Sequence, residues 1–310
     1  MATAVSQNVL AASTTLEEAQ MLRRKPTGFW RDTFRRFRQD KMACFFGIVF
    51  LLMLIFVLSA PIVSHLTGFT YSENHLELKT SKPGENGFIL GSDGNGRDVL
   101  TRLAYGGRIS LMFAFAGMLS ILAIGAIVGG CAGFFGGWFD NIAMRIAEVI
   151  LAMPVLPLLI LVSAMYRPSV IVLAGIVGIF SWPGLSRLIR GEVMSIRRRE
   201  YIDAARVTGA DSGRIMIKHV LPNVLPIILI WASLAVPGLI ITEAILSYIG
   251  VGVRPPTPSW GNMLQESQQF YRTAWTLIFI PGFAIYITVL SMTLTGNGIR
   301  DAMDVKLSKR

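Results

Sequence analysis

Residues 109–139 read ISLMFAFAGMLSILAIGAIVGGCAGFFGGWF and contain no Asp, Glu, Lys, Arg or His. A charged side chain at the centre of a bilayer costs about 2.5 to 3.5 kcal/mol, so runs of this kind are typical of membrane-spanning segments. A helix needs about 20 apolar residues to cross the hydrocarbon core, and this run is longer than that. It therefore predicts a transmembrane helix.

Outward from this segment, five further runs are free of charged residues and long enough to span. They cover residues 42–64, 149–166, 168–186, 220–242 and 273–299. The run 149–166 contains Pro154 and Pro157, and we expect residues 141–148 to extend its helix with their charged side chains facing protein. The sequence thus predicts an all-α membrane protein with six transmembrane helices, and an even number of spans places both termini on one side.

The composition of the whole chain agrees with this architecture. Of its 310 residues, 53% are hydrophobic and only 15% are charged, whereas a soluble domain has about 25% charged residues. These values exclude a soluble or disordered protein, and the net charge of +10 then indicates basic cytoplasmic loops and no nucleic-acid surface. Cys44 and Cys131 lie in uncharged runs, which excludes a disulfide framework. Residues 1–20 are polar, so we expect no cleavable signal peptide.

Lys and Arg are distributed unevenly between the two sides of the predicted bundle. Twenty-one lie on the side of the termini and 8 on the other, which makes the termini cytoplasmic. We expect a basic cytoplasmic tail at 1–41, a first helix and an extracytoplasmic loop at 42–108, a five-helix core at 109–299 and a cytoplasmic tail at 300–310. The basic residues of the first tail either signal this topology or bind lipid.

Glycine recurs at every fourth position in the second span, at Gly125, Gly129, Gly133 and Gly137. On a helix these positions share one face, which lets a neighbouring backbone approach closely. The sequence therefore predicts a helix-packing face, which is either static or a surface that slides.

The chain lacks the motifs of common catalytic sites. There is no Gly-Lys dipeptide, which excludes a Walker-type ATP site, and the histidines have no HExxH spacing. No GxSxG nucleophile elbow occurs either. We expect a non-enzymatic chain without a cofactor or metal of its own, driven by a partner or by an ion gradient.

A long polar segment separates the fourth and fifth spans, and residues 196–223 read IRRREYIDAARVTGADSGRIMIKHVLPN. The pattern predicts a short helix over 201–207 that ends at Gly209. Its small and charged residues, which would let another protein approach closely, are Asp203, Ala204, Ala205 and Arg206. The alternative is a solvated connector.

This segment resembles the EAA loop of ABC importer permeases. The match rests on Asp203-Ala204-Ala205, on Gly209 six residues beyond the acid and on Leu221-Pro222 eighteen beyond it. In that family the loop, here 190–222, holds the coupling helix that docks on the ATPase subunit. The resemblance implies this role for Asp203, Ala204, Ala205, Arg206, Gly209, Leu221 and Pro222. The sequence departs from the family in having Asp203 in place of Glu and His219 in place of Ile.

Further segments resemble the permeases of dipeptide, oligopeptide and nickel importers, and most closely the "C" permease of the peptide systems. They are residues 90–98 with 106–111, residues 255–261 and residues 296–302. The resemblance implies a type I ABC importer permease-like bundle in a bacterial or archaeal cytoplasmic membrane.

The resemblance also implies partners. These are a sister permease in a heterodimer, two cytoplasmic ATPases that bind ATP and Mg, an extracytoplasmic substrate-binding protein and membrane lipid, but no nucleic acid. We expect the binding protein to dock on the outside loops, where prolines stiffen a segment that presents Trp260. The docking residues we predict are Asp93, Arg97, Asp98, Pro256 and Trp260. The alternative is that these loops only cap the helices.

Two acids lie near the predicted membrane boundaries. Glu148 follows Arg145 by three residues and either pairs with it or contacts substrate. Glu243 follows an apolar run and is a candidate pathway residue that would attract the amino terminus of a peptide.

The predicted function is ATP-driven import of short peptides, with this chain forming half of the pathway. Nickel and glutathione importers share the same permease pattern and stay open as alternatives. A different class, an ion-coupled secondary transporter, would use intramembrane acids as ion sites. The spans hold few such residues, and the long cytoplasmic loop would then have no purpose.

Overall fold

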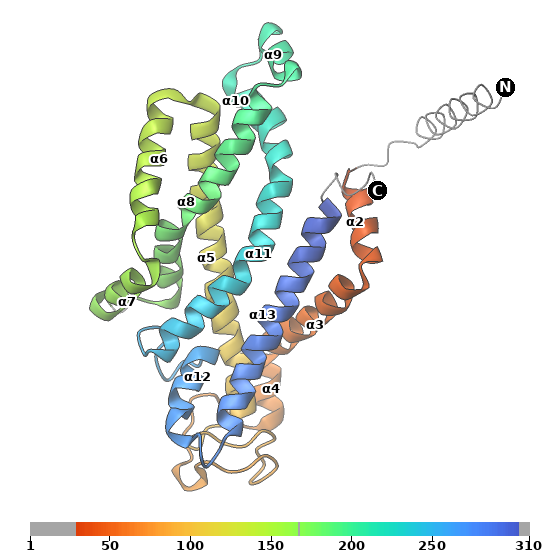
Figure 1. Ribbon diagram of the computed structural model, residues 1–310. Helices are drawn as coiled ribbons and strands as arrows, with labels where there is room; N and C mark the ends of the chain where they lie inside the picture. The colour runs from red at the N-terminus through yellow and green to blue at the C-terminus, as the bar shows by residue number, and fades with distance from the viewer. Residues whose placement is uncertain (1–28, 167, 304–310) are drawn as a thin grey trace, which may run out of the picture.

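A computed structural model describes residues 29–166 and 168–303 of the protein, and these residues fold as a bundle of α-helices (Figure 1). In chain order the helices are α2 (Phe29–Gln39), α3 (Lys41–Leu58), α4 (Ala60–Thr67), α5 (Val99–Phe135), α6 (Gly137–Ala152), α7 (Val155–Tyr166), α8 (Val170–Arg197), α9 (Glu200–Val207), α10 (Ser212–Ile215), α11 (Leu221–Tyr248), α12 (Trp260–Ser267) and α13 (Thr276–Met303). Pairing of the β type is limited, within these residues, to an isolated bridge between Ser92 and Asp98.

Five helices are long and apolar enough to cross a membrane. They are α3, α5, α8, a continuous helix over Ser212–Tyr248 that includes α11, and α13. A sixth crossing requires α6 and α7 to act together as one bent span, because the two helices meet at 81°. The all-α membrane fold predicted from the charge-free runs is confirmed.

The predicted third span is not one continuous helix. Helix α6 ends at Ala152, and Met153 adopts an extended conformation with φ −87° and ψ 137°. Pro154 explains the break, because a proline disfavours helical backbone at the residue before it and has no N–H to donate. Residues 141–148 do extend the helix that begins the run, as expected, but only as far as Ala152. The rest of the run forms α7, which takes a new direction after Pro154.

Helix α5 is the central element of the bundle. Asp98 caps its first turn, because Oδ2 accepts hydrogen bonds from the N–H of Thr101 at 2.8 Å and from its hydroxyl at 2.6 Å. The helix runs for 37 residues and ends at Phe135, followed by Gly136 as its C-cap with φ 69°. Helix α8 packs along α5, and α11 packs against α5 and α13. Apolar side chains such as Phe113 and Ile121 are buried in this contact.

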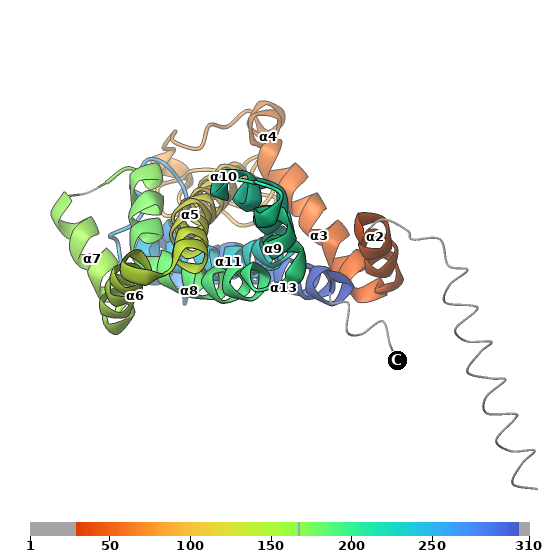
Figure 2. The ribbon, with the colours of Figure 1, turned by 90° about the horizontal axis from the view of Figure 1, so that it is seen from above.

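Helices α3 and α13 lie side by side at the edge of the bundle (Figures 1 and 2). Gly298 of α13 lies directly against Ala43 of α3. Helix α2 also packs on α13, so the two ends of the described chain meet at one end of the bundle, as predicted. Leu52 and Ile55 of α3 are more than half exposed, which gives this helix an apolar outer face suited to lipid.

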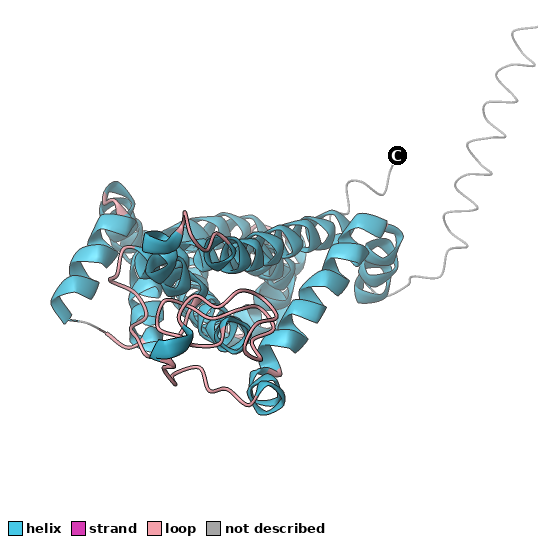
Figure 3. Cartoon of the chain, turned by 90° about the horizontal axis from the view of Figure 1, so that it is seen from below, coloured by secondary structure: helices cyan, strands magenta, loops and turns pink. Residues whose placement is uncertain are grey.

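The two ends of the bundle carry different structures. Helices α9 and α10 stand at one end, and α12 and the loop 68–98 lie at the other (Figure 1). The view onto the second end shows loops passing over the ends of the helices (Figure 3). The distribution of Lys and Arg predicts that the end with α9 is cytoplasmic and that the end with α12 lies outside.

Candidate functional site

Helix α9 lies at the cytoplasmic end of the bundle and packs against it through buried side chains. Ile202 of α9 and Ile215 of α10 have exposures of 0% and 1%, and they fix the segment to the bundle. Beyond the helix, Gly209 has φ 85°, and its N–H donates to the carbonyl of Arg206 at 3.0 Å. This left-handed conformation favours glycine, so Gly209 turns the chain away from α9.

The opposite face of α9 is open. Val207 is 88% exposed, Asp203 and Ala204 are exposed, and Ala205 is half-buried. The Nη1 atom of Arg206 donates to Oδ1 of Asp203 at 3.1 Å, so the two charges pair on the helix surface. A seated helix with a small and partly apolar outer face is suited to contact with another protein. No motif in the sequence marks Val207 as a site residue.

Leu221 and Pro222 begin α11 and connect it to the α9–α10 segment. A wider π turn over Met216–Val220 precedes them. Pro222 lacks the N–H that an α-helix would donate to the carbonyl four residues earlier, which accounts for the irregular turn beside it. The helix nevertheless continues from Ser212 to Tyr248. The α9–α10 segment is thereby joined to a helix that crosses the bundle.

Three of the predicted packing glycines lie in the contact between α5 and α8. A Cβ atom on Gly125 would lie 3.0 Å from Leu185, and one on Gly133 would lie 2.7 Å from the carbonyl oxygen of Arg190. On Gly129 it would collide with the backbone of Ser186. At Gly129 and Gly133 the backbones approach so closely that only glycine fits, whereas at Gly125 the Leu185 side chain would have to shift.

Gly137 does not belong to this face, so its inclusion in the predicted set is wrong. Helix α5 ends at Phe135, and Gly137 begins α6 with φ 59° and no atom within 4 Å of its Cβ position. The same contact includes Gly178 of α8, where a side chain would collide with Ser120. Gly178 lies outside the four-residue period, so the sequence analysis missed it.

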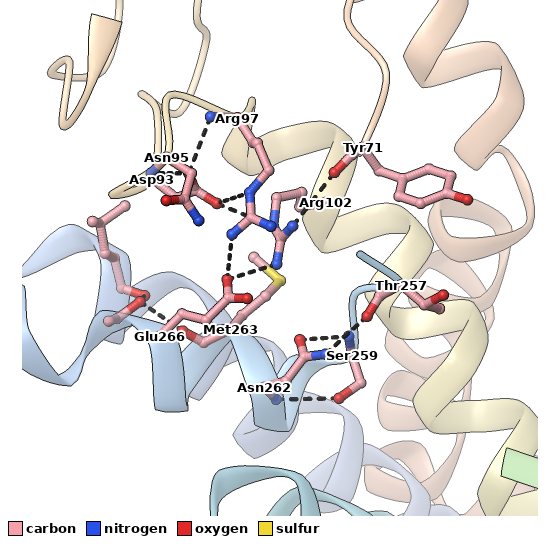
Figure 4. Close-up of polar contacts among 12 residues, drawn as sticks. Tyr71, Asp93, Asn95, Arg97, Arg102, Thr257, Ser259, Asn262, Met263 and Glu266 are labelled. Atoms are coloured by element: carbon pink, nitrogen blue, oxygen red, sulfur yellow. Dashed lines mark hydrogen bonds and ion pairs between the residues drawn. The ribbon is translucent and has the colours of Figure 1, made fainter. Parts of the chain in front are cut away.

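A buried ion cluster joins the outside loop to α12 (Figure 4). Arg97 donates from Nε to Oδ2 of Asp93 at 2.7 Å and from Nη2 to Oε2 of Glu266 at 2.5 Å. Arg102 donates from Nη2 to the same Glu266 oxygen at 2.8 Å. Sequence reasoning had named Asp93 and Arg97 only, because the pairing of Arg102 with Glu266 is long-range and leaves no local pattern.

Asp98 and Trp260 are also internal. Asp98 caps α5, and the indole Nε1 of Trp260 donates to the carbonyl of Leu103 at 3.0 Å. The Trp260 side chain has 0% exposure, and a Cβ on Gly107 would come within 2.6 Å of its ring. Gly107 therefore makes room for the indole against α5.

The expectation that the outside loop presents Trp260 to a partner is wrong. Of the five predicted docking residues, only Pro256 is exposed. The other four, Asp93, Arg97, Asp98 and Trp260, are buried. They determine the shape of the outside end and are not themselves its surface.

Glu243 is buried where α11 meets α5. Its Oε2 accepts a hydrogen bond from the hydroxyl of Ser110 at 2.6 Å, and its Oε1 accepts one from the hydroxyl of Ser247 at 2.6 Å. The Oγ atom of Ser110 also accepts from the N–H of Trp260 at 3.2 Å. The residue borders a cavity of about 360 Å³ between α5, α8 and the loop after α11. Its 1% exposure shows that the carboxylate does not stand free in a vestibule.

Glu148 lies on α6 and pairs with its own helix. Its Oε2 accepts a hydrogen bond from Nη1 of Arg145 at 2.9 Å, and both side chains are at least half exposed. In the part of the chain that the structure describes, no group of three or more His, Cys, Asp or Glu could hold a metal ion.

Comparison with known families identifies this arrangement. Residues 121–309 match the family described as binding-protein-dependent transport system inner membrane component. Residues 28–83 match the N-terminal TM domain of oligopeptide transport permease C. The chain belongs to this family of transport permeases.

Relatives of the permease match along nearly its full length. It is 36% identical to the oligopeptide transport system permease protein OppC of Haemophilus influenzae, over 94% of this chain and 92% of the relative. It is 36% identical to the dipeptide permease DppC of Alkalihalophilus pseudofirmus, over 90% of each chain. Identity is also 36% to the glutathione permease GsiD of Pectobacterium atrosepticum, over 90% and 91%.

The family match confirms the resemblance found in the loop and in the outside segments. The permease is a multi-pass protein of the bacterial inner membrane and the non-catalytic membrane subunit of a peptide-type ABC importer. The relatives' names include more than one cargo, so family membership defines the transport class and leaves the substrate open.

Proposed function

We propose that this permease imports short peptides and that α9 couples its bundle to the ATPases. Two of the relatives described above are named for oligopeptides and dipeptides, which supports this cargo. In the proposed complex, the permease and a sister permease each form half of the pathway. Two cytoplasmic ATPases bind ATP and Mg, and an extracytoplasmic binding protein delivers the peptide.

The coupling proposal rests on how α9 packs on the bundle. Its exposed face is available to a partner, while Ile202 on its inner face is fully buried. Helix α9 follows α8 after a short turn, and a continuous helix from Ser212 leads into α11. Movement imposed on α9 by closing ATPases would therefore reach two helices that pack on α5.

Substitutions on the exposed face of α9 test this proposal. Val207→Asp and Ala204→Arg place a charge or a large side chain where the ATPase would dock, without entering the core of the permease. In a reconstituted complex we expect about thirtyfold lower ATP-dependent peptide uptake, because one central contact in an interface contributes about 2 kcal/mol.

The matched control for these variants is Ser212→Asp, an exposed change just beyond α9, which should leave uptake within twofold, a margin of about 0.4 kcal/mol. Size-exclusion chromatography of each variant permease establishes that it is folded. Full uptake by both α9 variants would show that the ATPases dock elsewhere.

A competition experiment tests the cargo. Proteoliposomes that contain the complete importer would take up a labelled tripeptide in competition with unlabelled dipeptide, glutathione or Ni²⁺. We expect competition from peptides and none from Ni²⁺. Competition by glutathione alone would favour a glutathione importer. Uptake without ATPases would instead indicate an ion-coupled secondary transporter.

We also propose that the outside end receives the binding protein, with Pro256 in contact and the buried residues supporting the surface. Pro256→Asp should weaken binding of the binding protein about fivefold. Trp260→Ala should instead lower the thermal stability of the permease, because the indole is buried. Normal binding to Pro256→Asp would place the docking surface on other residues.

In the same proposal, Glu243 serves the pathway indirectly. Its carboxylate accepts hydrogen bonds from Ser110 of α5 and from Ser247, which lines the cavity described above, and so helps to determine the shape of that cavity.

A further inference from the structure

A second cavity lies at the cytoplasmic side of the bundle, between the turn from α5 to α6, the end of α8 and the Asp203 and Arg206 side chains of α9. Its volume is about 520 Å³. The polar and turn residues that line it are Gly136, Asp140, Arg197, Arg198, Asp203 and Arg206. We call it the arginine pocket. It shares Asp203 and Arg206 with the exposed face of α9, but Arg197 and Arg198 belong neither to that face nor to the predicted pathway.

The charges of the arginine pocket do not cancel. Asp140 is neutralised by Arg190, whose Nη2 donates to Oδ2 at 2.6 Å. Asp203 is paired with Arg206 at 3.1 Å. Within residues 29–166 and 168–303, Arg197 and Arg198 have no carboxylate partner within 4.0 Å. The pocket therefore holds two guanidinium groups whose charge is available to an anion from outside the chain.

The turn at Gly136 leaves space for such an anion. Gly136 has φ 69°, and a Cβ atom added to it would lie 3.5 Å from Nη1 of Arg197. The half-buried Arg197 thus extends over a turn that carries no side chain. A guanidinium group presents N–H donors in a planar fork that matches the oxygens of a phosphate.

Exposed aromatic side chains indicate the position of the arginine pocket along the bilayer normal. Phe135, Trp138 and Phe139 flank Gly136 and are 60%, 76% and 41% exposed. Tryptophan side chains such as Trp138 concentrate where the hydrocarbon core meets the headgroups. The turn from α5 to α6, and with it the pocket, therefore lies at the level of the cytoplasmic headgroups.

We propose that the arginine pocket binds the headgroup of an anionic phospholipid of the cytoplasmic leaflet, with its phosphate between Arg197 and Arg198. Basic pockets between membrane helices on this side are suited to such headgroups. A bound lipid would connect the end of α8 to the turn from α5 to α6, directly beside the base of α9. The proposal goes beyond peptide transport and does not depend on the cargo.

Native mass spectrometry of the purified permease, with whatever subunits co-purify, tests this inference. The protein in neutral detergent is titrated with phosphatidylglycerol or with phosphatidylcholine. We expect the double variant Arg197→Gln/Arg198→Gln to bind phosphatidylglycerol about thirtyfold more weakly than the original protein. Binding of phosphatidylcholine should not change.

The matched control is Arg199→Gln/Arg214→Gln, which removes the same charge from exposed positions outside the arginine pocket. It should keep the affinity for phosphatidylglycerol. The variant Arg197→Lys/Arg198→Lys should also retain most of the affinity, and it keeps the test valid if the glutamine variant fails to fold.

Three outcomes would overturn the inference. Equal losses in the pocket variant and the control would mean that only overall surface charge matters. Equal binding of phosphatidylcholine and phosphatidylglycerol would show that the pocket does not select a negatively charged headgroup. Full displacement of the lipid by inorganic phosphate at the same concentration would identify a site for free phosphate instead.

Discussion

Nη2 of Arg102 donates a hydrogen bond to Oε2 of Glu266 at 2.8 Å, across 164 residues of chain. The Arg102 side chain has an exposure of 1%, and it lies in the first turns of α5, whereas Glu266 lies on α12. A charge this deeply buried is tolerated only when it is paired. The pair therefore holds α12, at the outside end of the bundle, against the central helix α5.

Removal of this pairing should destabilise the permease. Arg102→Met leaves Glu266 with Arg97 alone and should lower the free energy of unfolding by about 3 kcal/mol. Thermal unfolding in detergent measures the loss. Arg108→Met is the control, because Arg108 is exposed and lies over the Tyr105 ring at 5.7 Å, a contact of about 1 kcal/mol. Equal losses in the two variants would mean that the cluster does not stabilise the fold.

Adjacent glycines of α5 should respond oppositely to alanine. Gly129→Ala forces a methyl group into the backbone of α8 and should cost about 1 to 3 kcal/mol. Gly130 has no atom within 4 Å of its Cβ position, so Gly130→Ala should be neutral or stabilising by up to about 1 kcal/mol. Expression level and thermal unfolding of the two variants check this. Similar behaviour would contradict close packing at Gly129.

The buried indole should matter more than an exposed one. Trp260→Phe removes the donor to the carbonyl of Leu103 and leaves a void, which should cost about 2 kcal/mol. Trp275 is 64% exposed, and Trp275→Phe should cost less than about 0.5 kcal/mol. Thermal unfolding in detergent compares them, and a small effect at Trp260 would argue against its place in the core.

Two glutamates provide a comparison of buried and exposed acids. Glu243→Gln replaces an oxygen that accepts from a serine hydroxyl with an amide group that cannot, at a cost of about 1 to 3 kcal/mol. Glu148→Gln breaks a surface ion pair with Arg145 and should cost less than about 1 kcal/mol. The order of the two melting temperatures is the test, and a reversed order would show that Ser110 and Ser247 do not depend on the carboxylate.

Thiol labelling tests the orientation of the bundle. Ser72 in the loop 68–98 and Ser212 at the start of α10 are exposed, and this loop and α10 lie at opposite ends of the bundle (Figure 1). In a background without Cys44 and Cys131, Ser72→Cys should react with an impermeant reagent in intact cells with a permeable outer membrane. Ser212→Cys should react only after the inner membrane is opened. Labelling of the second variant from outside would reverse the topology.

The membrane fold was predictable from the sequence because the cost of a charge in hydrocarbon acts on each segment separately. Charge-free runs thus located the spans, and the distribution of Lys and Arg oriented them. The motif around Asp203 was also recognisable in the sequence, because all of its residues lie within one short segment. The break at Pro154 had a visible signal in the sequence, but the angle between α6 and α7 depends on what each helix packs against.

Contacts between distant segments were decided only by the tertiary structure. Sequence reasoning placed Trp260 on an exposed docking loop, yet its indole is buried against α5, where Gly107 leaves space for it. It likewise grouped Gly137 with the packing glycines, although the helix ends first. Arg102 and Glu266 gave no signal at all, because a pairing across 164 residues arises only when α12 folds back onto the start of α5. The positions of the membrane spans depend on how each segment interacts with lipid or water, which its own composition decides. The burial and pairing of side chains depend on which segments contact each other, which only the tertiary structure decides.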